Sequence, residues 1–144
     1  MQYTIETIIE KPLEEVLEQF HTPSNYMKWM PGIKRYRKIS DHQREAGSKS
    51  IFEFTMNGKD FTIEETIVKN DMREIIAEYI SSGTLNIQTT VFSKIDQDKT
   101  RYRVNEAFKL KGFMKVIGLL MPGSFKKQTK KFVEAFKNFV ENRE

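Results

Sequence analysis

Residues 48–69 read SKSIFEFTMNGKDFTIEETIVK, and the pattern of this stretch decides the fold of the chain. Apolar and polar residues alternate on both sides of Asn57-Gly58, as they do when successive side chains point to opposite faces of a strand. Asn and Gly both tolerate the positive φ angles of a type I′ turn, which joins two antiparallel strands. The stretch therefore predicts a β-hairpin with strands near 48–57 and 60–69.

The same period of two extends over residues 33–111. Short segments rich in turn residues divide this region into six strands, placed near 34–41, 48–57, 60–69, 73–81, 84–95 and 100–111. Because short turns join antiparallel neighbours, these strands form a meander. Residues 2–10, QYTIETIIE, alternate in the same way and predict a seventh strand.

Helical spacing occurs on both sides of the meander. Pro12 suits the first position of a helix, and Ser24 is a plausible cap for a second short helix over residues 25–30. After residue 122, a mainly apolar stripe at helical spacing predicts an amphipathic helix of about 20 residues. This stripe consists of Phe125, Thr129, Phe132, Val133, Phe136, Phe139 and Val140.

The order of these elements predicts an α+β fold. Four Phe on one stripe need a broad apolar surface opposite them, and a twisted antiparallel sheet can curl around one helix to supply it. A length of 144 residues suits one domain, which we place over residues 1–144. We expect a seven-stranded curved antiparallel sheet around a long C-terminal helix, with two short helices between the first two strands.

This pattern resembles the START-like, or Bet v 1-like, superfamily (SRPBCC), whose fold is the helix-grip. Residues 10–16, EKPLEEV, resemble the opening of its polyketide cyclase/dehydrase-like branch, an apolar strand followed by Pro-x-x-x-Val. Residues 111–122 and the Lys-rich helix after them resemble the C-terminus of that branch. The resemblance implies that an apolar ligand is held between the sheet and the long helix.

Alternation predicts which side chains would face such a ligand. On the strand near 84–95, the inward face is predicted to include Leu85, Ile87, Thr89 and Val91. The complete set of predicted ligand-binding residues is Tyr26, Trp29, Phe52, Phe54, Ile63, Glu65, Tyr79, Ile87, Thr89, Glu106, Phe108, Met114, Ile117, Met121, Phe125 and Phe132.

Two carboxylates interrupt the predicted apolar face. On the predicted inward face, Glu65 lies between Ile63 and Ile67, and Glu106 lies between Val104 and Phe108. A lone ionised carboxylate in an apolar site is costly, so each must be paired, protonated or hydrated. Either they orient a ligand or a water molecule in a cavity, or they reach solvent or pair with a Lys or Arg.

Two apolar segments have more than one interpretation. Tyr26 and Trp29 could form a cavity rim or could simply pack the short helix against the sheet. The run 113–121, interrupted by Gly118, could gate the cavity, touch a membrane or pack in the core.

Several kinds of chemistry are excluded or not indicated. The absence of Cys excludes disulfides, zinc ribbons, iron–sulfur sites and thiol nucleophiles. The two histidines, His21 and His42, fit neither a metal-ligand spacing nor a hydrolytic triad, and no dinucleotide fingerprint is present. We therefore expect no metal, no cofactor and no catalytic residue. Neither a signal peptide nor an apolar run of about 20 residues is visible, so we expect a cytoplasmic protein without stable membrane insertion.

The net charge of +4 belongs to the C-terminal segment, because residues 113–144 contain seven Lys or Arg and three Glu. Lys126, Lys127, Lys130 and Lys131 lie on the polar side of the predicted helix. They form either a solvated face or a weak contact with an anionic surface or a protein. Nucleic-acid binding is not expected, because the helix turns its Phe residues toward the core.

The favoured function is binding or transport of a small hydrophobic ligand, lipid-like or aromatic, between the sheet and the C-terminal helix. One alternative is a protein-interaction module that uses the basic helix face, which a filled core would favour. The other is an enzyme of the cyclase/dehydratase type with a cavity carboxylate, which a Glu of raised pKa in a closed pocket would favour.

Overall fold

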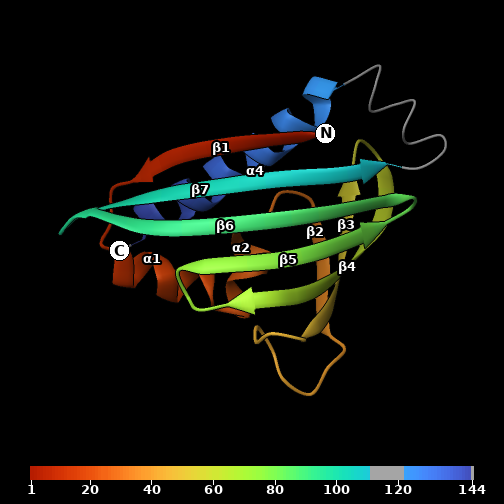
Figure 1. Ribbon diagram of the computed structural model, residues 1–144, viewed down its shortest axis with the longest axis horizontal. Coiled ribbons are helices and arrows are strands. Elements are labelled where there is room, and N and C mark those ends of the chain that lie inside the picture. Colours follow the sequence, from red (N-terminus) through yellow and green to blue (C-terminus); the bar gives the residue numbers. More distant parts are fainter. Residues whose placement is uncertain (111–121, 144) are drawn as a thin grey trace.

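The computed structural model describes residues 1–110 and 122–143, and in these ranges seven strands form one antiparallel sheet. The order across the sheet is β1-β7-β6-β5-β4-β3-β2, so every strand after β2 pairs with its predecessor and β1 joins β7 (Figure 1). The strands are β1 (Gln2–Ile9), β2 (Ile33–Lys38), β3 (Lys49–Met56), β4 (Lys59–Asn70), β5 (Glu74–Ser81), β6 (Thr84–Asp96) and β7 (Lys99–Leu110). The predicted meander and α+β fold are confirmed.

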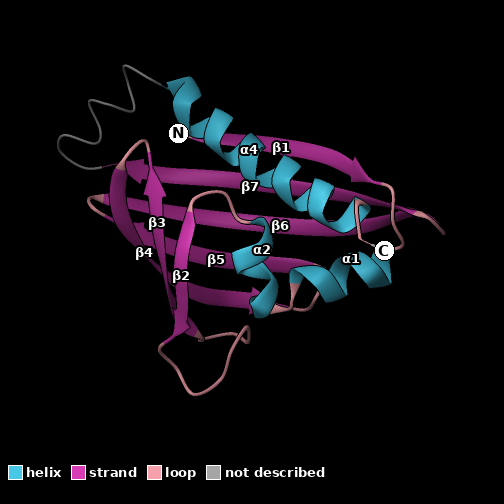
Figure 2. Ribbon diagram, turned by 180° about the vertical axis from the view of Figure 1, so that it is seen from behind, coloured by secondary structure: helices cyan, strands magenta, loops and turns pink. Residues whose placement is uncertain are grey.

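The helices lie together on one face of the sheet (Figure 2). The region between β1 and β2 contains α1 (Leu13–Phe20), a 3-10 turn η1 (Pro23–Asn25) and α2 (Tyr26–Trp29). Ser24 therefore lies inside a 3-10 turn and is not the predicted helix cap. The long helix α4 (Pro122–Glu141) runs along β1.

Side-chain contacts hold α4 beside β1 at several points along its length. The hydroxyls of Tyr3 and Thr129 share a hydrogen bond of 2.6 Å. Near the other end of the helix, Lys137 Nζ donates to the carbonyl oxygen of Ile8 at 2.5 Å. These two hydrogen bonds fix the edge strand β1 against α4, the helix around which the sheet curves.

The Asn57-Gly58 turn has the predicted geometry. Both residues have positive φ angles, 52° for Asn57 and 77° for Gly58. Ser82 and Gly83 also have positive φ angles, 27° and 76°, in the two-residue turn between β5 and β6. These turns determine the pairing registers of β3 with β4 and of β5 with β6.

The sheet is strongly curved, because β2 and β3 run steeply across the direction of β5, β6 and β7 (Figures 1 and 2). Gly32 allows the chain to enter β2 close to β3. A Cβ atom at this position would lie 2.5 Å from the carbonyl oxygen of Thr55, and its φ angle is +76°. Only glycine accommodates both the contact and the backbone angle.

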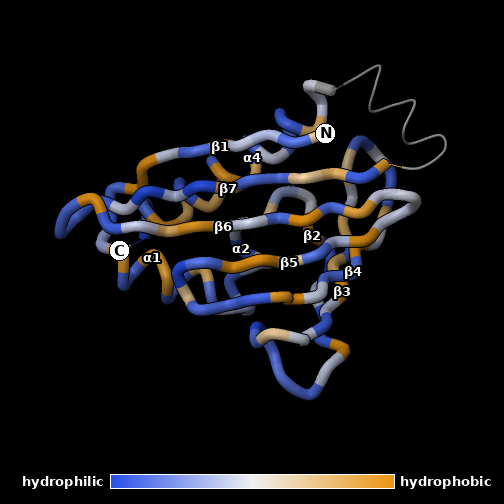
Figure 3. Tube along the Cα trace, in the orientation of Figure 1, coloured by the Kyte–Doolittle hydropathy of each residue, from blue (hydrophilic) through white to orange (hydrophobic). Residues whose placement is uncertain are grey.

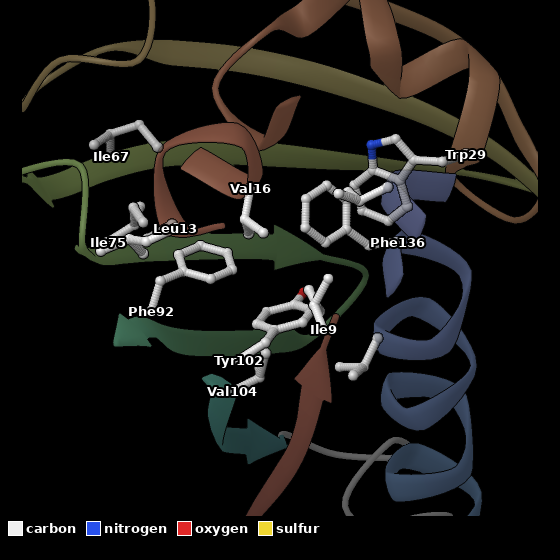
Figure 4. Close-up of a cluster of buried hydrophobic side chains, with 13 residues drawn as sticks. Ile9, Leu13, Val16, Trp29, Ile67, Ile75, Phe92, Tyr102, Val104 and Phe136 are labelled. Atoms are coloured by element: carbon white, nitrogen blue, oxygen red, sulfur yellow. The ribbon is translucent and has the colours of Figure 1, made fainter. Parts of the chain in front are cut away.

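The hydrophobic core occupies the end of the molecule near α1. Hydrophilic residues dominate the β6–β7 turn at the surface of this end (Figure 3). Phe136 and Val140 of α4 are fully buried against Val16 of α1 and residues of β6 and β7 (Figure 4). Phe125 and Phe132, in the N-terminal half of α4, are only partly buried. The main cluster therefore fills the end of the molecule near α1, and a second, smaller buried cluster joins α2 to β3.

The inward face of β6 differs from the predicted one. Directly paired residues share a face of the sheet, and Gln88 pairs with both Ala77 on β5 and Glu106 on β7. The even-numbered residues of β6 therefore face the helices. The prediction was wrong for Leu85, Ile87, Thr89 and Val91, which face the convex surface, where Leu85 lies opposite Ile80.

Candidate ligand-binding cavity

A cavity of about 640 Å³ lies between the concave face of the sheet and the N-terminal half of α4. Its walls are largely aromatic and include Phe52, Phe54, Phe61, Phe108, Phe125 and Phe132. The exposed residues Lys59, Asp60 and Ser82 also line it, so it opens to solvent between the β3–β4 and β5–β6 turns. This volume is in the range of about 300–1,000 Å³ typical of small-molecule sites.

Polar side chains cross the concave face in two adjacent rows. In one row, Glu65 on β4 pairs with Tyr79 on β5, and Tyr79 pairs with Asn86 on β6. In the next row, Gln88 on β6 pairs with Glu106 on β7. All five line the cavity, so the concave face of the sheet contributes two polar centres to its wall.

The first polar centre surrounds Glu65, which is 2% exposed. Tyr79 Oη donates a hydrogen bond of 2.8 Å to Glu65 Oε2, and Arg44 Nη1 lies 3.8 Å from the same oxygen. Burial raises the pKa of Glu65, while the charge of Arg44 and the Tyr79 hydrogen bond oppose the rise. This carboxylate is therefore paired and still lines the cavity, which combines the two interpretations left open above.

Arg44 reaches this centre from the loop between β2 and β3, and its φ angle is +68°. Asn70 Nδ2 donates to its carbonyl oxygen at 2.6 Å, which anchors the loop to the end of β4. The guanidinium carbon lies 5.6 Å from the centre of the Phe20 ring, a cation–π contact. Sequence reasoning missed Arg44, because a loop residue belongs to no periodic pattern.

Glu106 forms the second polar centre and is 4% exposed. Burial raises its pKa to about 7, and a hydrogen bond with the Asn86 side chain acts against this shift. Its Oε2 atom has no hydrogen-bond partner within the described residues. A carboxyl group with this pKa exchanges its proton near neutral pH, and it can donate or accept a hydrogen bond.

Eleven of the sixteen predicted ligand-binding residues line the cavity: Tyr26, Trp29, Phe52, Phe54, Ile63, Glu65, Tyr79, Glu106, Phe108, Phe125 and Phe132. Ile87 and Thr89 do not, because they lie on the convex face. Met114, Ile117 and Met121 lie outside the described residues. Their predicted roles in ligand binding stay predictions.

Asn86 and Gln88 are cavity residues that sequence reasoning missed. A signal for Asn86 was present in the sequence. The two-residue turn at Ser82-Gly83 places Asn86 opposite Tyr79, and directly opposed residues share a face. The apolar residues of β6 predicted that the odd-numbered residues face inward, and the prediction followed them and not the turn.

The basic face of α4 comprises Lys126, Lys127, Lys130 and Lys131, all exposed. Within residues 1–110 and 122–143, none of the four lies within 4.0 Å of a carboxylate. Their weak contact with an anionic surface or protein stays a prediction. No helix in the described part of the chain is long and apolar enough to cross a membrane, and the cytoplasmic location also stays a prediction.

A family model described as "Polyketide cyclase / dehydrase and lipid transport" matches residues 2–141. The chain belongs to this family. The match covers nearly the whole chain and confirms the resemblance to the polyketide cyclase/dehydrase-like branch of the START-like superfamily. No curated protein sequence matches the chain.

Solved structures share the helix-grip fold of this polyketide cyclase/dehydrase and lipid transport family member. The Zhui aromatase/cyclase from Streptomyces sp. R1128 is 11% identical, with a TM-score of 0.83 over 99% of this chain and 94% of that chain. A START superfamily protein from Mycobacterium smegmatis is 13% identical, with a TM-score of 0.82 over 97% of both chains. The protein TTHA0849 from Thermus thermophilus is 16% identical, with a TM-score of 0.75 over 98% of this chain and 94% of that chain. At these identities the similarity shows the fold alone.

Proposed function

We propose that this protein binds or carries a small hydrophobic ligand in the cavity between its sheet and α4. The observation that carries the proposal is a cavity of about 640 Å³ with aromatic walls and two polar centres. Transfer of apolar ligand surface from water to these walls supplies the driving force, and a few polar contacts orient the ligand. A filled core would favour the interaction-module alternative, and the cavity beside α4 gives that alternative no support.

The arrangement of the walls indicates how such a ligand lies. Phe125 and Phe132 approach from α4, and Phe54 stacks between Phe52 and Phe61 on the sheet. Phe54 on the sheet and Phe132 on α4 pack edge to face, with ring centres 5.8 Å apart. A flat or elongated apolar body fits against these rings, with its polar groups directed to the two carboxyl centres.

Binding of a neutral fluorescent probe tests the proposal. N-phenyl-1-naphthylamine should bind the wild-type protein in a saturable, one-to-one manner with enhanced fluorescence. Ile63→Trp places a larger side chain in the cavity wall and should weaken binding at least tenfold. The matched control is Ile80→Trp on the convex face, where Ile80 is 54% exposed, and it should bind like the wild type.

Two results would contradict the proposal. One is a wild-type protein that neither binds the probe nor releases an apolar molecule on solvent extraction after native mass spectrometry. The other is unchanged probe binding in Ile63→Trp, which would place the probe elsewhere on the protein.

An acid–base enzyme acting on a polyketide-like substrate is a second candidate, supported by Glu106. Its pKa of about 7 and its unpartnered Oε2 suit a group that moves a proton near neutral pH. Glu106→Gln would then keep probe binding but lose the conversion of a synthetic poly-β-ketone thioester to its cyclised product. If the wild type gives no product either, the carrier function stands alone.

A further inference from the structure

The guanidinium of Arg44 lies beside the cavity, and hydrogen bonds satisfy its donors only in part. Its Nη1 lies 3.8 Å from Glu65 Oε2, and its Nη2 lies 3.5 Å from His21 Nδ1. Its Nε has no hydrogen-bond partner among the described residues. A guanidinium has five N–H donors, and buried donors are normally satisfied, so this group has capacity for another acceptor.

Tyr26 provides a second unpartnered donor at the same end of the cavity. It is 2% exposed, and its hydroxyl has no hydrogen-bond partner within the described residues. Burial raises the pKa of this hydroxyl, and the charge of Arg44 opposes the rise. Tyr79 packs against the cluster that contains Tyr26 and bonds to Glu65, the ion-pair partner of Arg44. The neighbouring Tyr36 hydroxyl, in contrast, bonds to Ser50 Oγ at 3.1 Å and accepts from Gln43 Nε2 at 2.8 Å.

The charges at this end of the cavity already balance. Arg44 and Glu65 form an ion pair, with Nη1 3.8 Å from Oε2, and the Tyr79 hydroxyl donates a hydrogen bond to the same carboxyl oxygen. Burial lowers the pKa of His21, so the imidazole adds no charge near neutral pH. A ligand carboxylate would leave a net negative charge among apolar walls, which is costly. A neutral oxygen atom would satisfy the donors and keep the balance.

We propose that Arg44 and Tyr26 form a subsite for a neutral oxygen acceptor of the ligand, the carbonyl oxygen of a ketone, ester or amide. This inference rests on the proposed binding function and narrows the ligand class. The ligand carries a carbonyl at the end that enters beside Arg44, and it carries no free carboxylate there. Its apolar body extends from this subsite toward the phenylalanines of β3, β4 and α4.

Three probes that share one naphthalene body separate these possibilities. They are 2-acetylnaphthalene, with a carbonyl oxygen, 2-ethylnaphthalene, with no acceptor, and 2-naphthoate, with a carboxylate. Equilibrium dialysis against the full chain at about pH 7.5 gives each dissociation constant. The acetyl probe should bind about tenfold tighter than the ethyl probe, as a hydrogen bond to a charged group implies. It should also bind about tenfold tighter than the carboxylate.

Variants assign the preference to the subsite. Tyr26→Phe removes one donor and should reduce the acetyl preference several-fold. The double variant Arg44→Met/Glu65→Gln removes both charges together, so that no carboxylate is left buried without its partner, and should bring the two neutral probes within about twofold. Tyr36→Phe is the matched control and should keep the full preference, because Tyr36 does not line the cavity. Circular dichroism confirms that each variant is folded.

Each outcome decides the inference. Equal binding of the acetyl and ethyl probes to the wild type overturns the subsite and leaves the proposed function intact. Tightest binding of 2-naphthoate shows that the subsite takes an anion and also overturns the inference. A preference that survives in Tyr26→Phe and in the double variant places the carbonyl elsewhere. Failure of all three probes to bind refutes the proposed function as well.

Discussion

Replacement of Glu106 by glutamine tests the electrostatics of the cavity directly. Glutamine has nearly the shape of a protonated glutamic acid and cannot ionise. The carboxyl group is 4% exposed and lies against apolar walls, where its charged form loses hydration. The two proteins should therefore have similar stability when Glu106 is protonated and should diverge when the wild-type group becomes charged.

The sign and size of the divergence follow from the pKa of Glu106. Its ordinary value is 4.5, and burial raises it to about 7 in the folded protein. Between these pH values the folded chain binds more protons than the unfolded chain. The free energy of unfolding of the wild type therefore falls as the pH rises through this window, and the loss is complete above it. At 1.36 kcal/mol per pKa unit, the loss is about 3 kcal/mol.

Urea unfolding followed by circular dichroism, at intervals from about pH 4.5 to pH 8.5, measures this effect. Glu106→Gln should gain about 3 kcal/mol relative to the wild type across the series, because the other titrating groups are common to both proteins. Glu64→Gln, on the exposed convex face, is the matched control and should change the free energy by at most about 0.5 kcal/mol at every pH. A difference between Glu106→Gln and the wild type that stays constant with pH would refute the reasoning.

Three further predictions concern the fold, and urea unfolding measures each. Gly32→Ala should destabilise the protein by at least about 2 kcal/mol more than Gly47→Ala. Both glycines have positive φ angles, but only at Gly32 would the new Cβ contact backbone, the carbonyl oxygen of Thr55. Equal losses of stability would show that the backbone of β3 can shift to make room for the Cβ atom. Phe136→Ala, at a fully buried position, should cost about 3–5 kcal/mol, and a loss below about 1 kcal/mol would contradict the described packing. Ser124→Glu should stabilise the protein by about 0.5 kcal/mol, because the first turn of α4 has no acidic residue to complement its dipole, and destabilisation would contradict this.

Local sequence signals predicted most of the fold. The positive φ angles needed at Asn57 and Gly58, the alternation of the strands and the apolar stripe of α4 are properties of short segments. Each restricts the backbone or the buried face without knowledge of distant residues. The strand order also followed, because short turns join consecutive strands of a meander.

The face of β6 shows where such signals conflict. Apolar Leu85 and Ile87 favoured one face, and the two-residue turn at Ser82-Gly83 favoured the other. The face indicated by the turn is the observed one, because the hydrogen-bonded register of two strands allows each residue only one face of the sheet. A strand that lines a cavity can carry polar residues inward, so its hydrophobic pattern is a weaker guide than its register.

The candidate site was predicted only in part, for a related reason. Glu65, Tyr79 and Glu106 were found because each lies on a strand whose inward face is otherwise apolar. Arg44 was not found, because its position depends on a loop that the Asn70 side chain holds at the end of β4. Charge balance at Glu65 is therefore a property of residues that are distant in the sequence.

The sequence by itself determined the elements, their order and the apolar faces of α4 and of every strand tested except β6, because backbone preference and side-chain period act over a few residues. The tertiary structure alone decided that the core near Phe136 is filled while the space beside Phe125 and Phe132 is open. It also decided that Arg44 enters that space. A cavity is the volume that packed side chains from several elements leave between them, and no single segment encodes that difference.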